Sequence, residues 1–290
     1  MTESASQPVF RFAPSPNGYL HIGHAWSALY NQRLARESGG RFLLRIEDID
    51  AGRCRREYDD AIREDLAWLG VTWEEPVRRQ SEHFDDYARA LRTLRDRGVA
   101  YPCFCSRAEV ARAAAAVPDA PRDPDGAPLY PGTCRGLDRS EIERRLASGR
   151  EPALRLDLAA ALALIGRGLS WREFGEDAAG RVVAAEPGLW GDAVIGRRDT
   201  PASYHIAVVV DDALQGVTDV ARGRDLFHAT GLHRLLQELL GLPAPRYRHH
   251  ALLLDEAGAK LSKSARSKSL RALRAEGAGA AEVRARLGFS

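Results

Sequence analysis

A segment near the start of the chain, Pro14 to His24, joins an expected strand to the start of an expected helix. The N-terminus of a helix presents N–H groups and a partial positive charge, so it favours phosphate groups. His21 and His24 are three residues apart and can therefore face the same side of the first helical turn. Gly23 has no Cβ, so a flat base can approach the backbone there. These residues predict a nucleotide-binding turn, although a turn with two surface histidines would give the same pattern.

A second group of reactive side chains lies far along the chain, where residues 260–264 read Lys-Leu-Ser-Lys-Ser. Lys260 and Lys263 can neutralise negative charge while a phosphoryl group transfers. Taken alone, this segment is also compatible with a solvated linker.

Three of the four cysteines lie close together in a segment with little periodicity, at Cys103, Cys105 and Cys134. Grouped thiols of this kind favour a zinc site. No histidine lies within 101–140, so the fourth ligand would be an oxygen atom from a side chain or from water. Tyr130 and Asp138 both qualify, because zinc can lower the pKa of a phenol. The alternative is a set of buried thiols without metal.

The elements expected around these residues are those of an α/β fold. A strand at 9–13, a helix at 20–37 and a strand at 42–46 predict a parallel strand–helix–strand unit. The apolar run from Ser203 to Asp211 predicts a buried strand of the central sheet. Further helices are expected at 53–69, 81–97, 140–148 and 225–240, and further strands at 152–157 and 252–255.

Composition limits the class of protein. The chain has 290 residues, of which 44% are hydrophobic and 28% charged, which is typical of a soluble globular protein and excludes general disorder. No run approaches the ~20 apolar residues of a membrane-spanning helix. The first residues lack the features of a secretory signal, so we expect a cytoplasmic protein without membrane contact. Residues 260–290 hold eight Lys or Arg and two Glu, and this basic tail suits either a polyanion or a solvated helix pair.

Together, the His-Ile-Gly-His and Lys-Leu-Ser-Lys-Ser segments resemble the signature pair of class I aminoacyl-tRNA synthetases. Four further segments resemble the glutamyl and glutaminyl enzymes of that class: 10–16, 45–50, Tyr204 with 210–212, and 222–225. The resemblance covers about residues 8–265. It implies a Rossmann-like catalytic domain.

The cysteine pattern resembles one branch of these enzymes. Cys-x-Cys followed by Tyr-x-x-x-Cys is similar to the glutamyl-Q tRNA(Asp) synthetases, in which the tyrosine is a zinc ligand. Only about 26 residues follow Ser264, so no anticodon-binding domain is expected. The implied organisation is a first catalytic half at 1–100, a zinc-bearing insertion at 101–185, a second catalytic half at 186–250, and the lysine-rich loop with a short helical tail at 251–290.

The resemblance implies a ligase that activates L-glutamate with ATP and Mg²⁺ and transfers it to queuosine at the wobble position of tRNA(Asp). The expected partners are ATP, L-glutamate and the anticodon stem-loop of that tRNA, and we expect a monomer. The implied catalytic residues are His21, His24, Lys260 and Lys263. The implied ATP-binding residues are His21, Gly23, His24 and Lys263. The implied zinc ligands are Cys103, Cys105, Tyr130 and Cys134, holding one structural ion.

The implied glutamate site must bind two carboxylates and an amine. The residues implied for it are Arg11, Ala13, Ser15, Glu47, Tyr204 and Arg222. Guanidinium forks suit carboxylates, with Arg222 favoured for the side-chain carboxylate, and Glu47 suits the α-ammonium. A structural Arg11–Glu47 bridge is the alternative. At the level of function, the alternatives are a truncated glutamyl-tRNA synthetase that charges a tRNA 3′ end, a small-molecule ligase of the same superfamily, and an RNA-binding module with an inactive catalytic domain.

Overall fold

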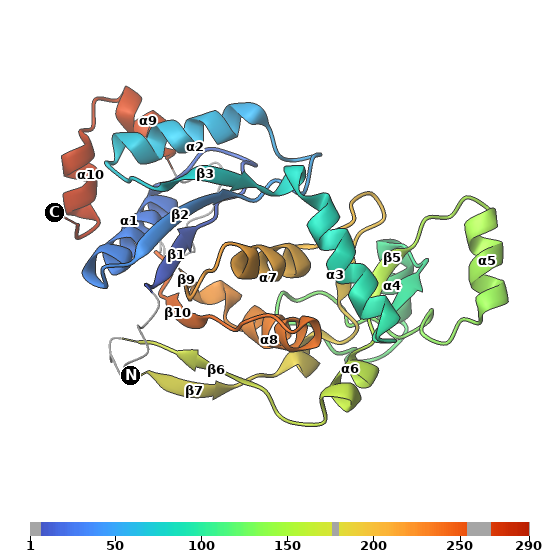
Figure 1. Cartoon of the computed structure of the whole chain (residues 1–290). Coiled ribbons are helices and arrows are strands. Elements are labelled where there is room, and N and C mark those ends of the chain that lie inside the picture. The colour runs from blue at the N-terminus through green and yellow to red at the C-terminus, as the bar shows by residue number, and fades with distance from the viewer. Residues whose placement is uncertain (1–6, 176–179, 254–267, 290) are drawn as a thin grey trace.

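The computed structural model describes residues 7–175, 180–253 and 268–289 (Figure 1). A three-stranded parallel sheet has the order β1-β2-β3, with β1 at Val9–Phe12, β2 at Arg41–Ile46 and β3 at Glu74–Arg79. Between β1 and β2 the chain forms helix α1, Ile22–Glu37. This is the expected strand–helix–strand unit, and the parallel pairing of β1 with β2 confirms it.

A second sheet continues the first, with the order β7-β6-β10-β9. Its strands are β6 at Ser170–Glu173, β7 at Arg181–Ala184, β9 at Asp219–Gly223 and β10 at Arg246–His250. The start of β9 lies beside the start of β1, because Thr218 N donates to Val9 O at 3.1 Å and Val9 N donates to Thr218 Oγ1 at 2.8 Å. Strand order therefore reverses at β1, and in such sheets ligands bind at the carboxyl ends of the strands at this point.

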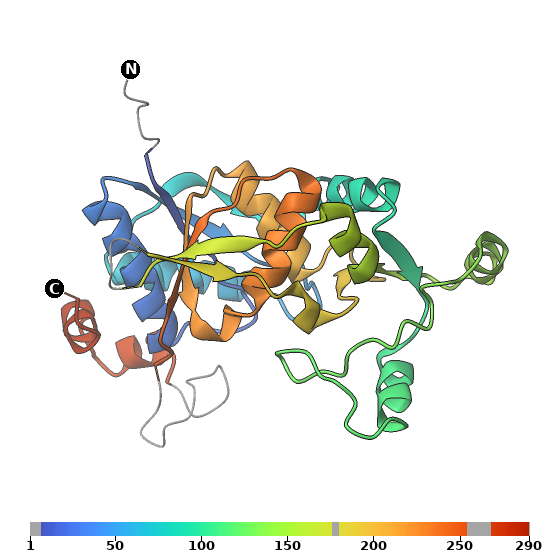
Figure 2. The same cartoon turned by 90° about the horizontal axis from the view of Figure 1, so that it is seen from below.

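Helices cover both faces of this composite sheet (Figures 1 and 2). Leucines and valines of α7 and α8 form a large apolar cluster with α3, while α1, β1 and β2 form another. The helices are α2 at Arg56–Trp68, α3 at Phe84–Asp96, α7 at Tyr204–Leu214, α8 at Ala229–Leu240, α9 at Leu270–Ala275 and α10 at Ala280–Arg286.

The middle of the chain adds a small antiparallel sheet with the order β4-β5-β8. Its strands are β4 at Ala100–Cys103, β5 at Ala153–Leu156 and β8 at Val194–Gly196, and the accompanying helices are α4 at Arg107–Ala115, α5 at Arg139–Ala147 and α6 at Leu158–Ile165. Helices α4 and α5 stand out from the body of the molecule (Figure 2). β6 and β7, which lie within 101–185 in sequence, pair instead with the sheet of β9 and β10.

Two sequence predictions are wrong. Residues Ser203 to Asp211 do not form a strand: Ser203 caps helix α7 by accepting from Ile206 N at 3.5 Å, and residues 206–212 of this helix are buried. The strand expected at 252–255 lies earlier in the chain, where β10 is found at Arg246–His250. Leu252 and Leu253 lie outside any strand, and residues 254 and 255 are outside the described ranges. The helix expected at 225–240 begins later, at Ala229, after a 3-10 turn at Arg224–Leu226.

Among the helices of the described ranges, none combines the length and the apolar character needed to cross a membrane.

Candidate active site

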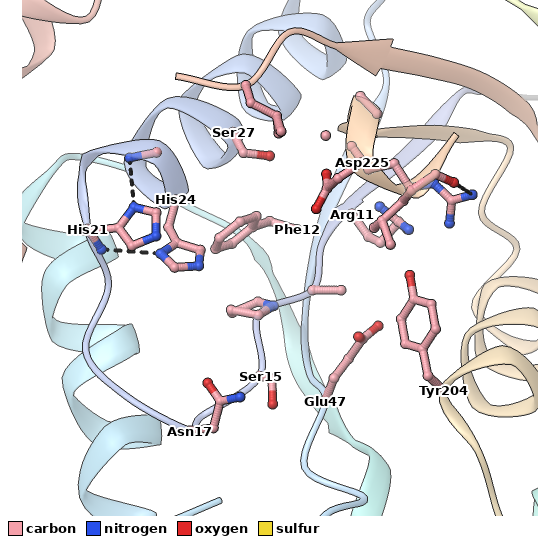
Figure 3. A pocket seen from close by; sticks show the side chains of 18 of the residues that line it. Arg11, Phe12, Ser15, Asn17, His21, His24, Ser27, Glu47, Tyr204 and Asp225 are labelled. Atoms are coloured by element: carbon pink, nitrogen blue, oxygen red, sulfur yellow. Dashed lines mark hydrogen bonds between the residues drawn. The ribbon is translucent and has the colours of Figure 1, made fainter. Parts of the chain in front are cut away.

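A cavity of about 590 Å³ opens at the carboxyl ends of β1, β2, β9 and β10 (Figure 3). The structure brings every candidate ATP- or glutamate-binding residue within the described ranges to its wall: Arg11, Ala13, Ser15, His21, Gly23, His24, Glu47, Tyr204 and Arg222. Lys260 and Lys263 lie outside the described residues. Leu253, close before them in sequence, lines the cavity, and Ser269, close after them, pairs with His21 in an isolated bridge.

The two histidines of the helix start are held by the first turn of α1. His21 is the N-cap, and its Nδ1 accepts from Gly23 N at 3.0 Å. His24 Nδ1 in turn accepts from His21 N at 3.2 Å. Because both Nδ1 atoms accept, a neutral ring carries its proton on Nε2. A Cβ on Gly23 would lie 3.0 Å from His21 Nδ1, so the lack of a side chain there makes room for the His21 ring itself.

A buried ion network lies on the opposite side of the cavity. Asp212 Oδ1 accepts from Arg11 Nε at 3.2 Å and from Arg45 Nη1 at 2.7 Å, and Arg45 Nη2 donates to Glu47 at 3.1 Å. Arg11 is therefore paired with Asp212, whereas Glu47 is paired with Arg45. Burial would raise the pKa of Asp212, but the two arginines hold it below its usual range. Burial raises the pKa of Glu47 in spite of its arginine neighbours.

Tyr204 and Arg222 complete this side of the cavity. Tyr204 is the first residue of α7, and its side chain points toward Arg11 and Glu47 (Figure 3). Burial raises the pKa of its hydroxyl to about 12, so the hydroxyl is a hydrogen-bond donor at neutral pH. Arg222 lies in β9 and is buried. Cations and a carboxylate thus face a helix N-terminus across one cavity, an arrangement that can hold an amino acid beside a phosphate.

The cysteine group comes together at a separate place. The sulfur atoms of Cys103, Cys105 and Cys134 lie within 4.8 Å of one another. The Tyr130 hydroxyl is 3.4 Å from Cys105 Sγ. Asp138, the rival oxygen ligand, instead caps helix α5 by accepting from Glu141 N at 2.8 Å. The donor set at this point is therefore three thiols and a phenol, which fits a tetrahedral zinc ion.

A second cavity of about 940 Å³ lies between the cysteine group and α7. Cys105 and Tyr130 line it, and it shares Asp50, Arg197 and Tyr204 with the first cavity. The two cavities therefore adjoin at Tyr204.

Several polar residues that lie around the site have no role predicted from the sequence. Asp212 is the second of two acidic residues that directly follow an apolar run, and a charge at such a position is a signal for a buried ion pair. Thr230, His233 and His249 surround Arg222, and no spacing rule connects them to it.

Comparisons with known proteins identify relatives of this chain. The family of class I tRNA synthetases (E and Q), catalytic domain, matches residues 9–284. Glutamyl-Q tRNA(Asp) synthetase of Rhodobacter capsulatus is 45% identical over 97% of this chain and 100% of its own length. Glutamate–tRNA ligase 2 of Nitrosococcus oceani is 41% identical over 92% of this chain and 56% of its own.

Among solved structures, a glutamate tRNA ligase from Elizabethkingia meningosepticum, in complex with its amino acid, superposes with a TM-score of 0.72 at 28% identity. The superposition covers 94% of this chain and 54% of that one. The chain thus spans about half the length of the glutamate–tRNA ligases that it matches.

Proposed function

Because the chain belongs to the class I tRNA synthetase family of the glutamyl and glutaminyl enzymes, we propose that it activates L-glutamate with ATP and transfers the glutamyl group to the queuosine of tRNA(Asp). The observation that carries this proposal is the match to a Glutamyl-Q tRNA(Asp) synthetase over nearly the full length of both chains. The cavity supports it, because its cations and its carboxylate are those that glutamate requires.

In the proposed glutamate complex, Arg222 binds the side-chain carboxylate and Glu47 binds the α-ammonium. Arg11 helps to neutralise the α-carboxylate, Ala13 and Ser15 form the floor, and the Tyr204 hydroxyl closes the site. Bidentate guanidinium contacts give both charge and orientation, which suits recognition of a dicarboxylic acid.

In the activation step, an oxygen of the α-carboxylate attacks the α-phosphorus of ATP. The bond to the bridging oxygen breaks, and glutamyl-adenylate and pyrophosphate result. Two anions must meet, so donors around the phosphates have to offset their repulsion. His21, His24 and the N-terminus of α1 supply them, together with Lys260 and Lys263. Mg²⁺ bound with ATP adds positive charge to the phosphates.

We assign one structural zinc ion to Cys103, Cys105, Cys134 and Tyr130. The support is the convergence of three thiols and a phenol from the end of β4 and from the segment between α4 and α5. Bound there, the ion would cross-link the segment between β4 and β5.

The transfer step moves the glutamyl group to a hydroxyl of the queuosine ring and releases AMP. The projecting segment with α4 and α5 and the basic tail are the proposed RNA-facing parts of a monomer acting in the cytoplasm. An unpaired loop suits such a compact protein, because its bases can be splayed into a pocket.

The test is transfer of labelled glutamate, with ATP, to two tRNA pools, one containing queuosine and one lacking it. We expect label in the first pool only. Equal label in both pools would instead indicate a glutamyl-tRNA synthetase acting at the 3′ end. Label in neither pool would contradict transfer, and ATP–pyrophosphate exchange over the amino acids would then show whether glutamate activation holds.

A further inference from the structure

Within the described ranges, the guanidinium group of Arg222 donates hydrogen bonds only to uncharged acceptors, and it lies over the Tyr247 ring, 5.3 Å from the ring centroid. Its Nε donates to His249 Nε2 at 3.2 Å, and its Nη1 lies 3.3 Å from His233 Nδ1. Its Nη2 donates to Thr230 Oγ1 at 2.7 Å and to Leu226 O at 3.2 Å. No carboxylate of the described residues forms an ion pair with it. A buried cation without a counter-ion is costly to the fold.

The other buried arginines of this region are compensated differently. Asp212 accepts from both Arg11 and Arg45, and Arg45 also contacts Glu47. An arginine with a purely structural role is expected to have such a carboxylate partner, since removing one charge of a buried pair is strongly destabilising. Among the described residues Arg222 departs from this pattern, and the lack of a carboxylate partner there points to a ligand.

The hydrogen bonds assign the protonation of both histidines. Arginine has donors only, so His249 Nε2 and His233 Nδ1 must both accept and therefore carry no proton. His249 holds its proton on Nδ1, 2.9 Å from Glu173 Oε2, and His233 holds its proton on Nε2, 3.2 Å from His205 Nδ1. The imidazole rings of His233 and His249 are therefore both neutral, and they are opposite tautomers.

The surroundings favour these neutral forms. The side chain of His249 is 1% exposed, and His233 is 2% exposed. Burial and the charge of Arg222 lower the pKa of His233 well below its usual value. Burial also lowers the pKa of His249, although Glu173 opposes the effect. Glu173 additionally accepts from Trp171 Nε1 at 2.9 Å, which fixes its carboxylate.

We propose that His233 and His249 are positioning residues that orient Arg222 through neutral acceptors, so that its full charge stays available for the side-chain carboxylate of the substrate. Glu173 acts one step further away, by holding His249 in the tautomer that can accept. The inference rests on the proposed function, because it takes glutamate as the ligand of Arg222. A carboxylate in place of either imidazole would satisfy the same hydrogen bond and compete with the substrate for the cation.

The test compares two variants of one shape, His233→Asn and His233→Asp. Each offers an oxygen near the position of Nδ1. They differ in charge, and in the second group of the side chain, which is an N–H donor in Asn and an acceptor oxygen in Asp. In glutamate-dependent ATP–pyrophosphate exchange, we expect the Asn variant to keep the KM for glutamate within about threefold, and the Asp variant to raise it by about tenfold or more. The KM for ATP should change much less, and discrimination between glutamate and glutamine should fall in the Asp variant alone. Equal behaviour of the two variants, or equal shifts for ATP and glutamate, would overturn the proposal.

A measurement on the unsubstituted chain tests the proposal even where the variants fail to fold. Nitrogen NMR of the histidine-labelled protein reports the protonation of each imidazole nitrogen. We expect His249 with a proton on Nδ1 and His233 with a proton on Nε2 at neutral pH. An imidazolium or the opposite tautomer at either residue would overturn the proposal. Failure of the unsubstituted chain to exchange pyrophosphate with any amino acid would instead contradict the proposed function, and the tautomers could still be measured.

Discussion

Arg11 and Asp212 are joined by a hydrogen bond of 3.2 Å from Nε to Oδ1, although 201 residues separate them in the chain. The same Asp212 oxygen accepts from Arg45 Nη1 at 2.7 Å, and Arg45 has no exposed surface. One carboxylate therefore orients a guanidinium of the candidate glutamate site and neutralises a fully buried cation. Site geometry and stability depend on the same atom.

We expect Asp212→Asn to lower the free energy of unfolding by about 3 kcal/mol, because Arg45 loses a buried counter-charge. Asp219→Asn is the matched control. Asp219 pairs at 2.8 Å with Arg246, whose side chain is 45% exposed, so its loss should cost about 1 kcal/mol or less. Urea unfolding of both variants gives the comparison. Equal losses would show that Arg45 does not depend on Asp212.

Lys263→Ala should slow adenylate formation by about 100-fold or more while leaving glutamate affinity nearly unchanged, if this lysine meets the phosphates only in the transition state. Lys268→Ala is the control, because Lys268 is exposed and pairs with Glu276 at 2.8 Å. Single-turnover kinetics and glutamate titration separate the two quantities. A parallel loss of affinity and rate in the Lys263 variant would contradict this role.

Cys103→Ser should release the proposed zinc ion, since it removes a fully buried thiol from the donor set. Cys54→Ser provides the control with the same change of atoms, because Cys54 lies outside the cysteine group and contacts Ser15. Metal content per chain, measured by mass spectrometry of the purified proteins, should fall only in the first variant. Unchanged zinc in Cys103→Ser would refute the assignment.

Asp65 on α2 predicts a dependence of stability on pH. Burial raises the pKa of its carboxyl to about 6, and Arg274 at 3.8 Å opposes this only in part. Between about pH 4 and pH 6 the folded chain therefore binds more protons at Asp65 than the unfolded chain does, and this residue reduces stability as the pH rises.

Asp65→Asn should consequently stabilise the protein by about 2 kcal/mol above pH 6, with the gain vanishing toward pH 4. Glu64→Gln is the neighbouring control, since that exposed carboxylate pairs with Arg274 at 2.9 Å. Thermal unfolding across this pH range provides the readout. Parallel pH profiles for Asp65→Asn and the unsubstituted chain would contradict the prediction.

The first half of the fold follows from local pattern. The strand at 9–13, the helix after it and the strand at 42–46 could be predicted because turn residues separate elements of clear periodicity. The run from Ser203 to Asp211 could not, because a continuous apolar stretch fits a buried helix as well as a buried strand. Its three valines favour a strand by propensity, but the Ser203 cap and the burial of residues 206–212 in the helix outweigh that preference.

β10 could not be predicted because its sequence lacks the pattern of a buried strand. Its sequence, Arg-Tyr-Arg-His-His, has no apolar alternation, yet it lies between β6 and β9, where Tyr247 is buried and His249 contacts Arg222. Resemblance to a family identified Arg11, Glu47 and Arg222. The residues that orient Arg222 come from β10 and α8, and only the fold brings them together.

The separation of Arg11 from Asp212 also sets an order of events during translation. At about 5–20 residues per second, the ribosome needs about 10–40 s to proceed from one to the other. Over that time Arg11 and Arg45 belong to a nascent chain that does not yet contain Asp212, the carboxylate that they share. The strand carrying Arg222 emerges later still, and Ser269, which bridges to His21, follows it. A chain released early by the ribosome therefore lacks part of this cavity, so incomplete products cannot assemble the whole site.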